Sequence, residues 1–450
     1  MQQQAPAPAG AVFPLNPTRE YPTLVRGEGI HVYDQDGKEY IDAIAGIAVA
    51  LVGHGEQRVA ETIGRQAGTL TYCISNIFSN QPAEDLARRL GALTPDTLQH
   101  FLFTSGGSEA TEVAIKLARQ YYLARGQERH VVIGRWQSYH GATLGALSAT
   151  GHRGRRAKFE PLLLDFPHIE PSYCYRCPFG KTYPDCALEC ATTLETAIQE
   201  AGPDRVAAFI AEPIVGAAAG ATVPPPEYFP IIREICDRYD VLFIADEVIT
   251  GFGRTGQTFG MEHWSVTPDL MTMAKGISGG YAPLGAVAVS DRVWSVFSEQ
   301  QVTFDHIFTY AANPLSATVG SAVLDILVAD DLVQRSATRG EYLFAQAERW
   351  RKHAIVGDIR GRGLLLGVEL VADRATKEPF PPEVGASARL AAHCFERGLV
   401  IYPGSGCVDG VRGDHFLLCP PLVVTEPQLD RIVALLDQAF AATARELASV

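Results

Sequence analysis

The sequence predicts an α/β protein whose central sheet is mainly parallel and flanked by helices. Three observations lead to this prediction. Short apolar segments alternate with helical patterns in the middle of the chain, a hairpin signal lies near the N-terminus, and amphipathic helices fill the C-terminal quarter. Strands that are buried on both faces are continuously apolar, and the middle segments have this character.

Five strands are expected in the middle of the chain, at residues 100–105, 130–136, 206–214, 241–249 and 284–290. Between them, apolar residues recur every three or four positions, which predicts helices over residues 109–124 and 228–239. Strands that alternate with helices in this way form parallel pairs joined by helical crossovers.

The two ends of the chain predict a second, smaller α+β lobe. Residues 20–45 alternate in polarity around Asp36-Gly37, a dipeptide typical of hairpin turns. The C-terminal part contains strand-like runs and an amphipathic helix over residues 426–447. We expect the two parts of the small domain at residues 1–65 and 331–450 and the large domain at residues 66–330, with a short flexible arm at the N-terminus.

Composition argues against several classes of function. The 450-residue chain is 47% hydrophobic, enough for a large core, and its net charge of −13 disfavours binding to nucleic acid or to an anionic membrane. No apolar stretch approaches the roughly 20 residues needed to span a bilayer. The first residues lack the pattern of a secretion signal, so we expect a cytoplasmic enzyme.

One lysine has an unusual setting. Lys275 follows the apolar run 270–274 and precedes small residues, with no carboxylate nearby in the sequence. A buried amine that lacks a partner tends to lose its proton, and a neutral amine is a nucleophile that condenses with aldehydes. The alternative is a lysine at the edge of the core that extends its ammonium group to solvent. The motifs described next favour the nucleophile.

Two of these motifs lie beside predicted strands. At residues 105–110, glycines open a predicted helix, and backbone N–H groups at such a helix start bind anions. The alternative is an ordinary glycine-rich turn. Tyr139 follows the next strand, at the edge where open α/β sheets bind ligands, and its ring can stack on a flat heterocycle. Core packing is the alternative for this tyrosine.

A third motif ends the strand at residues 241–249. Asp246 lies deep in an apolar run, where an acid needs a cationic partner, and a protonated pyridine nitrogen suits it. A competing motif over residues 251–256 matches the G-x-G-x-x-G fingerprint of nicotinamide oxidoreductases. That fingerprint opens a helix and precedes an acid by roughly 20 residues. Here the following segment is not helical, and Gly276 occupies the place of the acid.

Four of the nine cysteines form a cluster with C-x2-C-x8-C-x3-C spacing, namely Cys174, Cys177, Cys186 and Cys190. Three alternatives stay open for them: a tetrahedral zinc site, one or two disulfides, or four reduced thiols. We expect a structural role in each case, because the segment has no histidine or carboxylate arranged to activate water.

Taken in order, four motifs closely resemble those of the class III (omega) aminotransferases. They are Ser-Gly-Gly-Ser-Glu-Ala at 105–110, Tyr-His-Gly at 139–141, Asp-Glu-Val at 246–248 with Phe-Gly-Arg-Thr-Gly at 252–256, and Lys-Gly at 275–276. That family consists of pyridoxal-phosphate (PLP) enzymes of fold type I. The resemblance covers nearly the whole chain and is closest to the pyruvate-using omega-transaminase branch.

The resemblance implies a role for each matching residue. Lys275 condenses with the cofactor aldehyde and then shuttles the substrate proton. Asp246 pairs with the ring nitrogen, while Tyr139 and Val248 cover the two ring faces. The backbone of Gly107 and Ser108 binds the phosphate, and Thr309 reaches the phosphate of the neighbouring subunit's cofactor. Glu212 matches the family's glutamate at the end of a strand. A homodimer with shared sites follows from the role of Thr309.

Departures from the family pattern bear on the substrate. Ala142, Ala217 and Leu417 stand at or near places where glutamate-using members carry an arginine, a gating glutamate and a second arginine. Without those cations a second carboxylate has no partner, which disfavours glutamate. Ile249 replaces a glutamine that often contacts the cofactor's phenolic oxygen. Arg412 resembles the mobile, carboxylate-binding arginine of the pyruvate branch, with a surface arginine as the alternative.

We therefore expect a homodimeric aminotransferase that moves an amino group from a primary amine, a β- or ω-amino acid or taurine to pyruvate by a ping-pong mechanism. The alternative is a PLP-dependent aminomutase or amino-acid epimerase, because the same lysine chemistry can return the nitrogen to its own substrate. A nicotinamide oxidoreductase is a more remote alternative. Arg153, Arg155 and Arg156 are interpreted as a solvated basic patch, with a place at the pocket entrance as the alternative.

Overall fold

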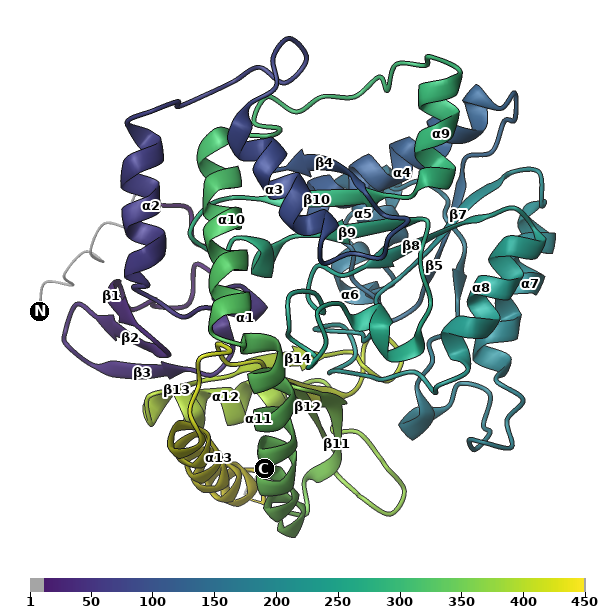
Figure 1. The fold of residues 1–450 in the computed structure, drawn as a ribbon. Helices are drawn as coiled ribbons and strands as arrows, with labels where there is room; N and C mark the ends of the chain where they lie inside the picture. The colour runs from purple at the N-terminus through teal and green to yellow at the C-terminus, as the bar shows by residue number, and fades with distance from the viewer. Residues whose placement is uncertain (1–11, 449–450) are drawn as a thin grey trace, which may run out of the picture.

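The structure, a computed structural model, describes residues 12–448 and arranges them around three β-sheets (Figure 1). A seven-stranded sheet forms the centre of the larger part of the molecule. Two four-stranded sheets, built from the terminal segments, lie beside it. The N-terminal arm expected from the sequence lies outside the described residues.

The central sheet has the strand order β4-β10-β9-β8-β7-β5-β6. Its strands are β4 (His100–Thr104), β5 (Val131–Arg135), β6 (His168–Ile169), β7 (Val206–Ala211), β8 (Leu242–Asp246), β9 (Leu270–Met273) and β10 (Gly285–Val289). β10 runs antiparallel to β4 and β9, and the other described pairs are parallel, which confirms the predicted sheet. All five predicted strands are present. β9, which the sequence analysis did not identify, lies between β8 and β10.

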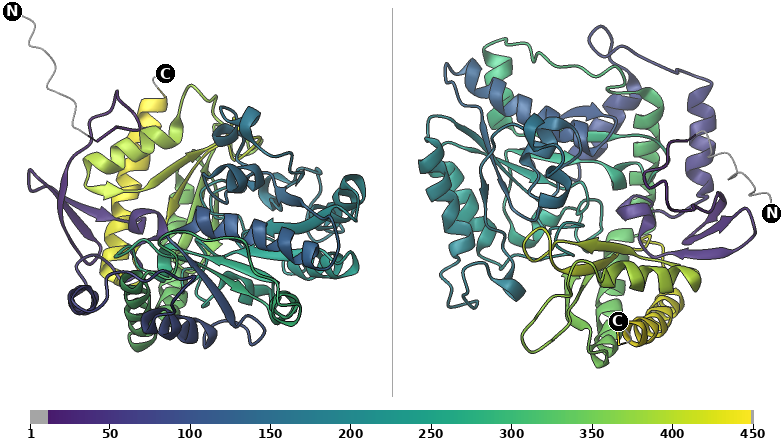
Figure 2. Two further views of the ribbon diagram at one scale, coloured as in Figure 1. Left: turned by 90° about the horizontal axis from the view of Figure 1, so that it is seen from above. Right: turned by 180° about the vertical axis from the view of Figure 1, so that it is seen from behind.

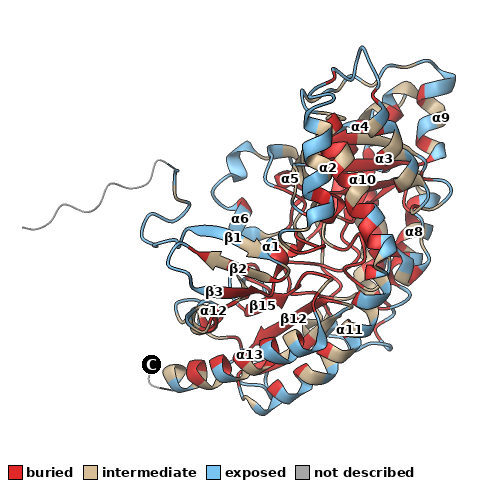
Figure 3. Cartoon of the chain, turned by 60° about the vertical axis from the view of Figure 1, so that its left-hand side comes forward, coloured by how far each residue is buried: buried red, intermediate tan, exposed pale blue. Residues whose placement is uncertain are grey.

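Helices cover both faces of this sheet because successive side chains of its strands point to opposite sides. Ala208 and Ile210 of β7 pack in one core with α4 (Gly107–Ala124) and α9 (Asp291–Glu299). Phe209 and Ala211 pack in the other core with α7 (Glu189–Ala201) and α8 (Tyr228–Arg238). Figure 3 shows the resulting pattern of buried strands and helices exposed along one side. The two predicted helices, α4 and α8, are confirmed.

The terminal segments share a sheet with the order β1-β2-β3-β13, formed by β1 (Leu24–Glu28), β2 (His31–Asp34), β3 (Glu39–Asp42) and β13 (Leu399–Val400). β2 and β3 pair antiparallel, which confirms the hairpin around Asp36-Gly37. β13 pairs with β3 in parallel, so the two ends of the chain meet here. The domain boundaries proposed from the sequence stay predictions.

The third sheet, with the order β11-β12-β15-β14, comes from the C-terminal segment: β11 (Val356–Arg362), β12 (Leu365–Leu370), β14 (Tyr402–Ser405) and β15 (Asp414–Leu418). α12 (Ala386–Glu396) and α11 (Leu332–Ala347) both contact α13 (Glu426–Leu447), the long yellow helix of Figure 2. α13 has the predicted bounds, and the Gln428 side chain accepts a hydrogen bond from the Thr425 N–H at its start.

The other helices are α1 (Ala45–Ala48), α2 (Gln57–Ala67), α3 (Gln81–Gly91), α5 (Leu144–Ala149), α6 (Arg153–Arg156) and α10 (Pro314–Ala329). α10 packs against α2 and α3 at the edge of the large sheet. Within residues 12–448, no helix combines the length and the apolar character needed to cross a membrane.

Candidate active site

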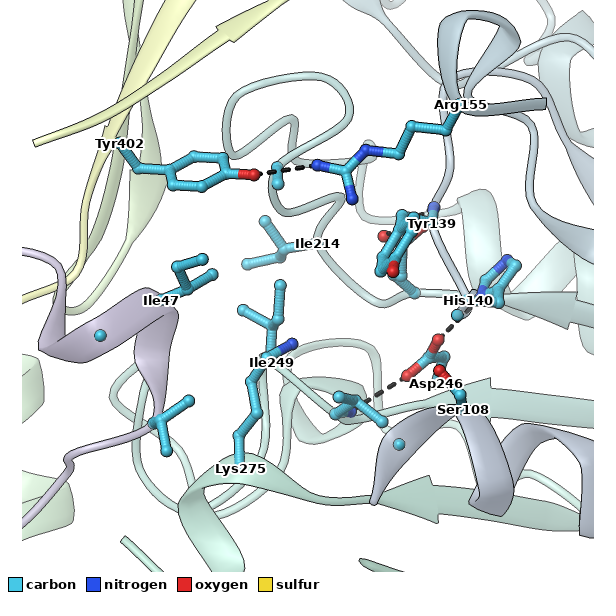
Figure 4. A pocket seen from close by; sticks show the side chains of 17 residues that line it. Ile47, Ser108, Tyr139, His140, Arg155, Ile214, Asp246, Ile249, Lys275 and Tyr402 are labelled. Atoms are coloured by element: carbon cyan, nitrogen blue, oxygen red, sulfur yellow. Dashed lines mark hydrogen bonds and ion pairs between the residues drawn. The ribbon is translucent and has the colours of Figure 1, made fainter. Parts of the chain in front are cut away.

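A pocket of about 350 Å³ opens where the parallel strands of the central sheet end (Figure 4). Asp246 ends β8, Glu212 follows β7, Lys275 follows β9 and Tyr139 lies four residues after β5. Because these strands run parallel, their carboxyl ends bring the four side chains to one edge of the sheet. Residues from α1 and β14 close the pocket on the side of the terminal segments.

Lys275 begins a single 3₁₀ turn after β9 and has a left-handed backbone, with φ of +48°. Its side chain extends into the pocket, and within residues 12–448 it makes no ion pair with a carboxylate. Burial lowers the pKa of the Lys275 amine, and the nearby charge of Asp246 opposes this shift. The setting favours the neutral, nucleophilic form of the amine.

Asp246 is buried on the far wall of the pocket and held in one orientation. One carboxylate oxygen pairs with His140 Nδ1 at 2.7 Å, and the other accepts a hydrogen bond from the Val248 N–H at 3.1 Å. The sequence analysis gave His140 no role, because a contact between residues 106 positions apart leaves no local signal. A fixed carboxylate of this kind is suited to binding a protonated heterocyclic nitrogen.

The start of α4 forms an anion-binding surface on the same wall. Gly106 precedes the helix without a side-chain cap, so backbone N–H groups at Gly107 and Ser108 are available to an anion. Glycine is needed for this approach: a Cβ on Gly107 would lie 3.0 Å from Val248 Cγ1, and one on Gly141 would lie 2.7 Å from Ser108 Oγ. Gly107, Ser108 and Val248 all line the pocket, as the sequence analysis expected.

Glu212 lies beneath Tyr139, whose N–H donates to Glu212 Oε1 at 3.4 Å. Burial raises the pKa of Glu212 to about 7, although His140 and Arg135 oppose this shift. The second oxygen of Glu212 lacks a hydrogen-bond partner among the described residues. The carboxyl group is therefore available to accept or donate a hydrogen bond in the pocket.

The outer part of the pocket combines one basic side chain with apolar ones. Arg155 of α6 donates from Nη2 to the Tyr402 hydroxyl of β14 at 2.9 Å. Ile47, Ile214 and Ile249 line the space between this pair and Lys275 (Figure 4). Arg155 is exposed and also lines the pocket, which supports the alternative of a place at the pocket entrance. The interpretation as a solvated patch was wrong for Arg156, which is buried.

Thr309 and Arg412 lie outside the pocket wall. Thr309 is exposed, and its carbonyl accepts a hydrogen bond from the Tyr72 hydroxyl at 3.0 Å. The Arg412 side chain is 50% exposed and pairs with Asp409, with Nε and Oδ2 separated by 2.7 Å. The structure thus holds Arg412 within its own loop, and its role as a mobile arginine that binds a substrate carboxylate stays a prediction.

The four clustered cysteines are Cys174, Cys177, Cys186 and Cys190, and each is a free thiol in the structure. Burial, followed by the neighbouring thiols, raises the pKa of Cys174 to about 11, which favours its protonated form. Across residues 12–448, no three His, Cys, Asp or Glu side chains are arranged to hold a metal ion. The zinc and disulfide alternatives thus gain no support.

Comparison with known proteins adds the family. The family model "Aminotransferase class-III" matches residues 16–440. The chain belongs to the class-III aminotransferases. It is 36% identical over 428 residues to a putrescine–pyruvate aminotransferase from Pseudomonas aeruginosa, covering 93% of this chain and 91% of that protein. Identity is also 36%, over 426 residues, with a taurine–pyruvate aminotransferase from Bilophila wadsworthia, covering 92% of this chain and 91% of that one.

A solved structure agrees with this assignment. An (S)-enantioselective omega-transaminase from Thermomicrobium roseum is 38% identical and superposes with a TM-score of 0.89 over 96% of both chains. Class-III aminotransferases depend on PLP and have fold type I, and the pocket fits that cofactor. It offers an uncapped helix start for a phosphate, a buried carboxylate for a ring nitrogen and a lysine amine for an aldehyde.

Membership in this family removes the oxidoreductase alternative. The glycines at 251–256 do not open a helix; a 3₁₀ turn, Gly260–Trp264, follows them. Arg254 within the motif is buried and donates hydrogen bonds to the carbonyls of Leu364 and Pro420. This segment of the aminotransferase thus connects the large sheet to the C-terminal segment rather than binding a nucleotide.

Proposed function

We propose that this aminotransferase moves an amino group from a primary amine, a β- or ω-amino acid or taurine to pyruvate by a ping-pong mechanism. The observation that carries the proposal is the position of the Lys275 amine, which faces the space between Asp246 and the start of α4. The named relatives that use putrescine or taurine with pyruvate support the choice of acceptor.

Bound PLP supplies an aldehyde and an electron-withdrawing ring, which together make a proton on the substrate's amine-bearing carbon acidic. The chain's own residues do the rest. Asp246, held by His140, keeps the ring nitrogen protonated, and the N–H groups of Gly107 and Ser108 hold the phosphate. The Lys275 amine, which lines the pocket, would take up that proton as a general base and give it back as a general acid.

The pocket offers a cationic partner for one acid group of the substrate but not for a second. Ala217 and Ile249 line it with apolar atoms, and Leu417 is buried within β15. Arg155 is the one arginine among the lining residues that the structure describes. A second carboxylate would lose its hydration without gaining a partner, so we propose pyruvate rather than 2-oxoglutarate as acceptor.

The experiment that tests transamination is a half-reaction. Mixing holoenzyme with an amine donor and no keto acid should convert the cofactor to its amine form once per site and then stop. Adding pyruvate should restore the starting spectrum and release alanine. Continued conversion of the donor without any keto acid would instead establish the isomerase alternative.

We also propose a homodimer in which Thr309 serves the partner's site. The segments between α2 and α3 and between α9 and α10 expose apolar side chains that a second copy would cover, namely Leu70, Tyr72, Ile74, Ile77, Phe78, Ile307 and Tyr310. Thr309 lies among them, outside the pocket of its own chain. A cytoplasmic location stays a prediction from the sequence.

Subunit mixing tests the shared site. Lys275→Ala and Thr309→Ala chains, co-expressed with different tags, should form mixed dimers in which one site has both residues and regains activity. If each site is built from a single chain, no mixed dimer contains a complete site, and activity stays at the level of the separate variants.

A further inference from the structure

The three arginines of α6 have different environments. Arg153 stacks over the Trp136 ring, with its Cζ 3.7 Å from the ring centroid. Arg156 is buried and donates hydrogen bonds to the carbonyls of Leu147, Ser148 and Thr150. Arg155, between them, lines the pocket. The first two arginines are therefore engaged in holding local structure, while the third faces the space where a substrate binds.

Arg155 is held in place without being neutralised. Its Nη2 donates to the Tyr402 hydroxyl at 2.9 Å, and its Cζ lies 4.5 Å from the centroid of the Tyr139 ring. Both partners are uncharged, and among residues 12–448 no carboxylate forms an ion pair with it. A guanidinium has five N–H donors in a planar fork, so most of them stay available to a planar or tetrahedral acid group.

The two ends of the pocket differ in charge. Asp246 and Glu212, the acids among the lining residues, lie at the inner end, where His140 and Arg135 face them. Arg155 and Tyr402 lie at the outer end (Figure 4). Ile47, Ile214 and Ile249 line the space between the ends. Because Asp246 is assigned to the cofactor's ring nitrogen, the donor's amine reaches Lys275. A matching donor therefore has an amine at one end, a short apolar spacer and an anion at the other that reaches Arg155.

We propose that Arg155 and the Tyr402 hydroxyl bind the acid group of the amino donor, so that the enzyme prefers donors with a carboxylate or sulfonate remote from the amine and disfavours diamines. The inference rests on the proposed transaminase function and narrows its donor class. Arg155 supplies charge-assisted hydrogen bonds, and Tyr402 can donate its O–H while still accepting from Arg155. The second ammonium of a diamine would meet a fixed positive charge instead.

Arg412 does not compete for this role in the structure. It pairs with Asp409 three residues earlier, and its side chain is half exposed to solvent. To reach a substrate it would have to break that ion pair and move into the pocket. Arg155 needs no such movement, because it already lines the pocket.

A matched donor series tests the proposal. β-Alanine and taurine carry a carboxylate and a sulfonate at the same spacing, propylamine is the neutral analogue and 1,3-diaminopropane the cationic one. The half-reaction is measured for each donor with holoenzyme and with the Arg155→Gln and Arg153→Gln variants. Comparing variant with wild type for each donor removes the differences in amine basicity. Arg153→Gln is the control, with the same substitution two residues away and outside the pocket.

We expect Arg155→Gln to lower kcat/KM roughly 10- to 100-fold for β-alanine and taurine, because one charged hydrogen-bonding partner is lost. In the same variant, kcat/KM for propylamine should change less than about threefold, and kcat/KM for 1,3-diaminopropane should rise. Arg153→Gln should change kcat/KM by the same factor for all four donors. A uniform loss across the donors, no loss, or a selective loss in Arg412→Gln with none in Arg155→Gln would overturn the proposal. A loss for β-alanine alone would restrict the acid to a carboxylate, and a loss for taurine alone to a sulfonate.

A binding measurement separates this inference from the proposed reaction. Calorimetry with propane-1-sulfonate and propanoate, which carry no amine, should give Kd values for holoenzyme that rise roughly 10-fold or more in Arg155→Gln. Tyr402→Phe should cause a smaller rise, because only one neutral donor is removed. If no donor reacts but these acids still bind through Arg155, the proposed function fails and the acid site stands. Unchanged Kd values in Arg155→Gln reject the acid site.

Discussion

Gly141→Ala perturbs the start of α4 while leaving every catalytic side chain in place. The φ of Gly141 is +145°, a conformation that residues with a Cβ rarely adopt. An alanine Cβ would lie 2.7 Å from Ser108 Oγ and 2.9 Å from Ser108 Cα, whereas ordinary contact begins at 3.4 Å. The substitution must therefore displace Ser108 and with it a backbone N–H that we assign to the cofactor phosphate.

The expected effect follows from these contacts. Strain at such a backbone position costs about 1–3 kcal/mol, and inserting a methyl group into a filled site adds about 1–3 kcal/mol. Misplacing one charge-assisted hydrogen bond to the phosphate costs about 1.5–3 kcal/mol, or roughly 10- to 100-fold in the Kd for PLP. We therefore expect a less stable protein that binds PLP at least roughly 10-fold more weakly.

Titrating cofactor-free protein with PLP, followed by absorbance, measures the Kd. Gly106→Ala is the matched control, because Gly106 is extended, with φ of 177°, and a Cβ there would meet nothing within 4 Å. Its Kd should stay within about threefold of wild type. Equal Kd values for the two variants would refute the phosphate site. If Gly141→Ala loses its native circular dichroism, Gly107→Ala replaces it, since a Cβ there crowds only side chains, Val248 at 3.0 Å and Ala274 at 3.5 Å.

Three further predictions concern two acids of the pocket and the cysteine cluster. Asp246→Asn should slow the half-reaction roughly 100-fold or more, since it removes a buried charge from opposite the ring nitrogen; a rate near wild type in stopped-flow absorbance would contradict the role of Asp246. The pKa of Glu212, raised to about 7 by burial, means that the folded state holds a proton that the unfolded state releases. The free energy of unfolding of the wild type should thus fall as pH rises from the ordinary carboxyl pKa to about 7. In urea titrations of cofactor-free protein, this fall should be smaller in Glu212→Gln than in wild type, by up to about 3 kcal/mol. If the free energy of unfolding depends on pH equally in both proteins, Glu212 is not the cause. Purified protein should bring less than one zinc per chain in elemental analysis, and after denaturation a thiol reagent should modify all four cysteines of the Cys174–Cys190 segment; a stoichiometric metal would reinstate the zinc alternative.

Much of the fold could be predicted because its signals are local. The Asp36-Gly37 turn lies between alternating residues, and α13 begins at a cap whose two partners are three residues apart. β9 was missed because its four residues, three of them apolar, are too few to distinguish a strand from a helix by periodicity. The pairing of β3 with β13 joins residues about 360 positions apart, and nothing in either segment specifies the other.

The residues of the candidate site also differ in how much of their setting is visible in the nearby sequence. Lys275, Asp246, Gly107 and Ser108 belong to short motifs in which neighbouring residues reveal the setting, and the structure brings them to one pocket. The place of Arg155 at the pocket entrance was only an alternative, because its partner Tyr402 lies 247 residues away and the sequence shows only a basic run.

The role of Arg412 rests on family resemblance, and the sequence also contains a charge partner for it. Asp409 lies three residues before it in a glycine-rich loop, at a spacing that allows the ion pair found in the structure. A role for Arg412 at the substrate therefore requires that this ion pair breaks, and that role stays a prediction.

The central claim is that Lys275 is the nucleophile that binds the cofactor. Borohydride reduction of the holoenzyme makes that bond permanent, and peptide mapping by mass spectrometry then locates it. We predict one pyridoxyl group per chain, attached to Lys275 and absent from the Lys275→Ala variant. Attachment to any of the other six lysines, or a reduced holoenzyme without a covalent label, would contradict the account.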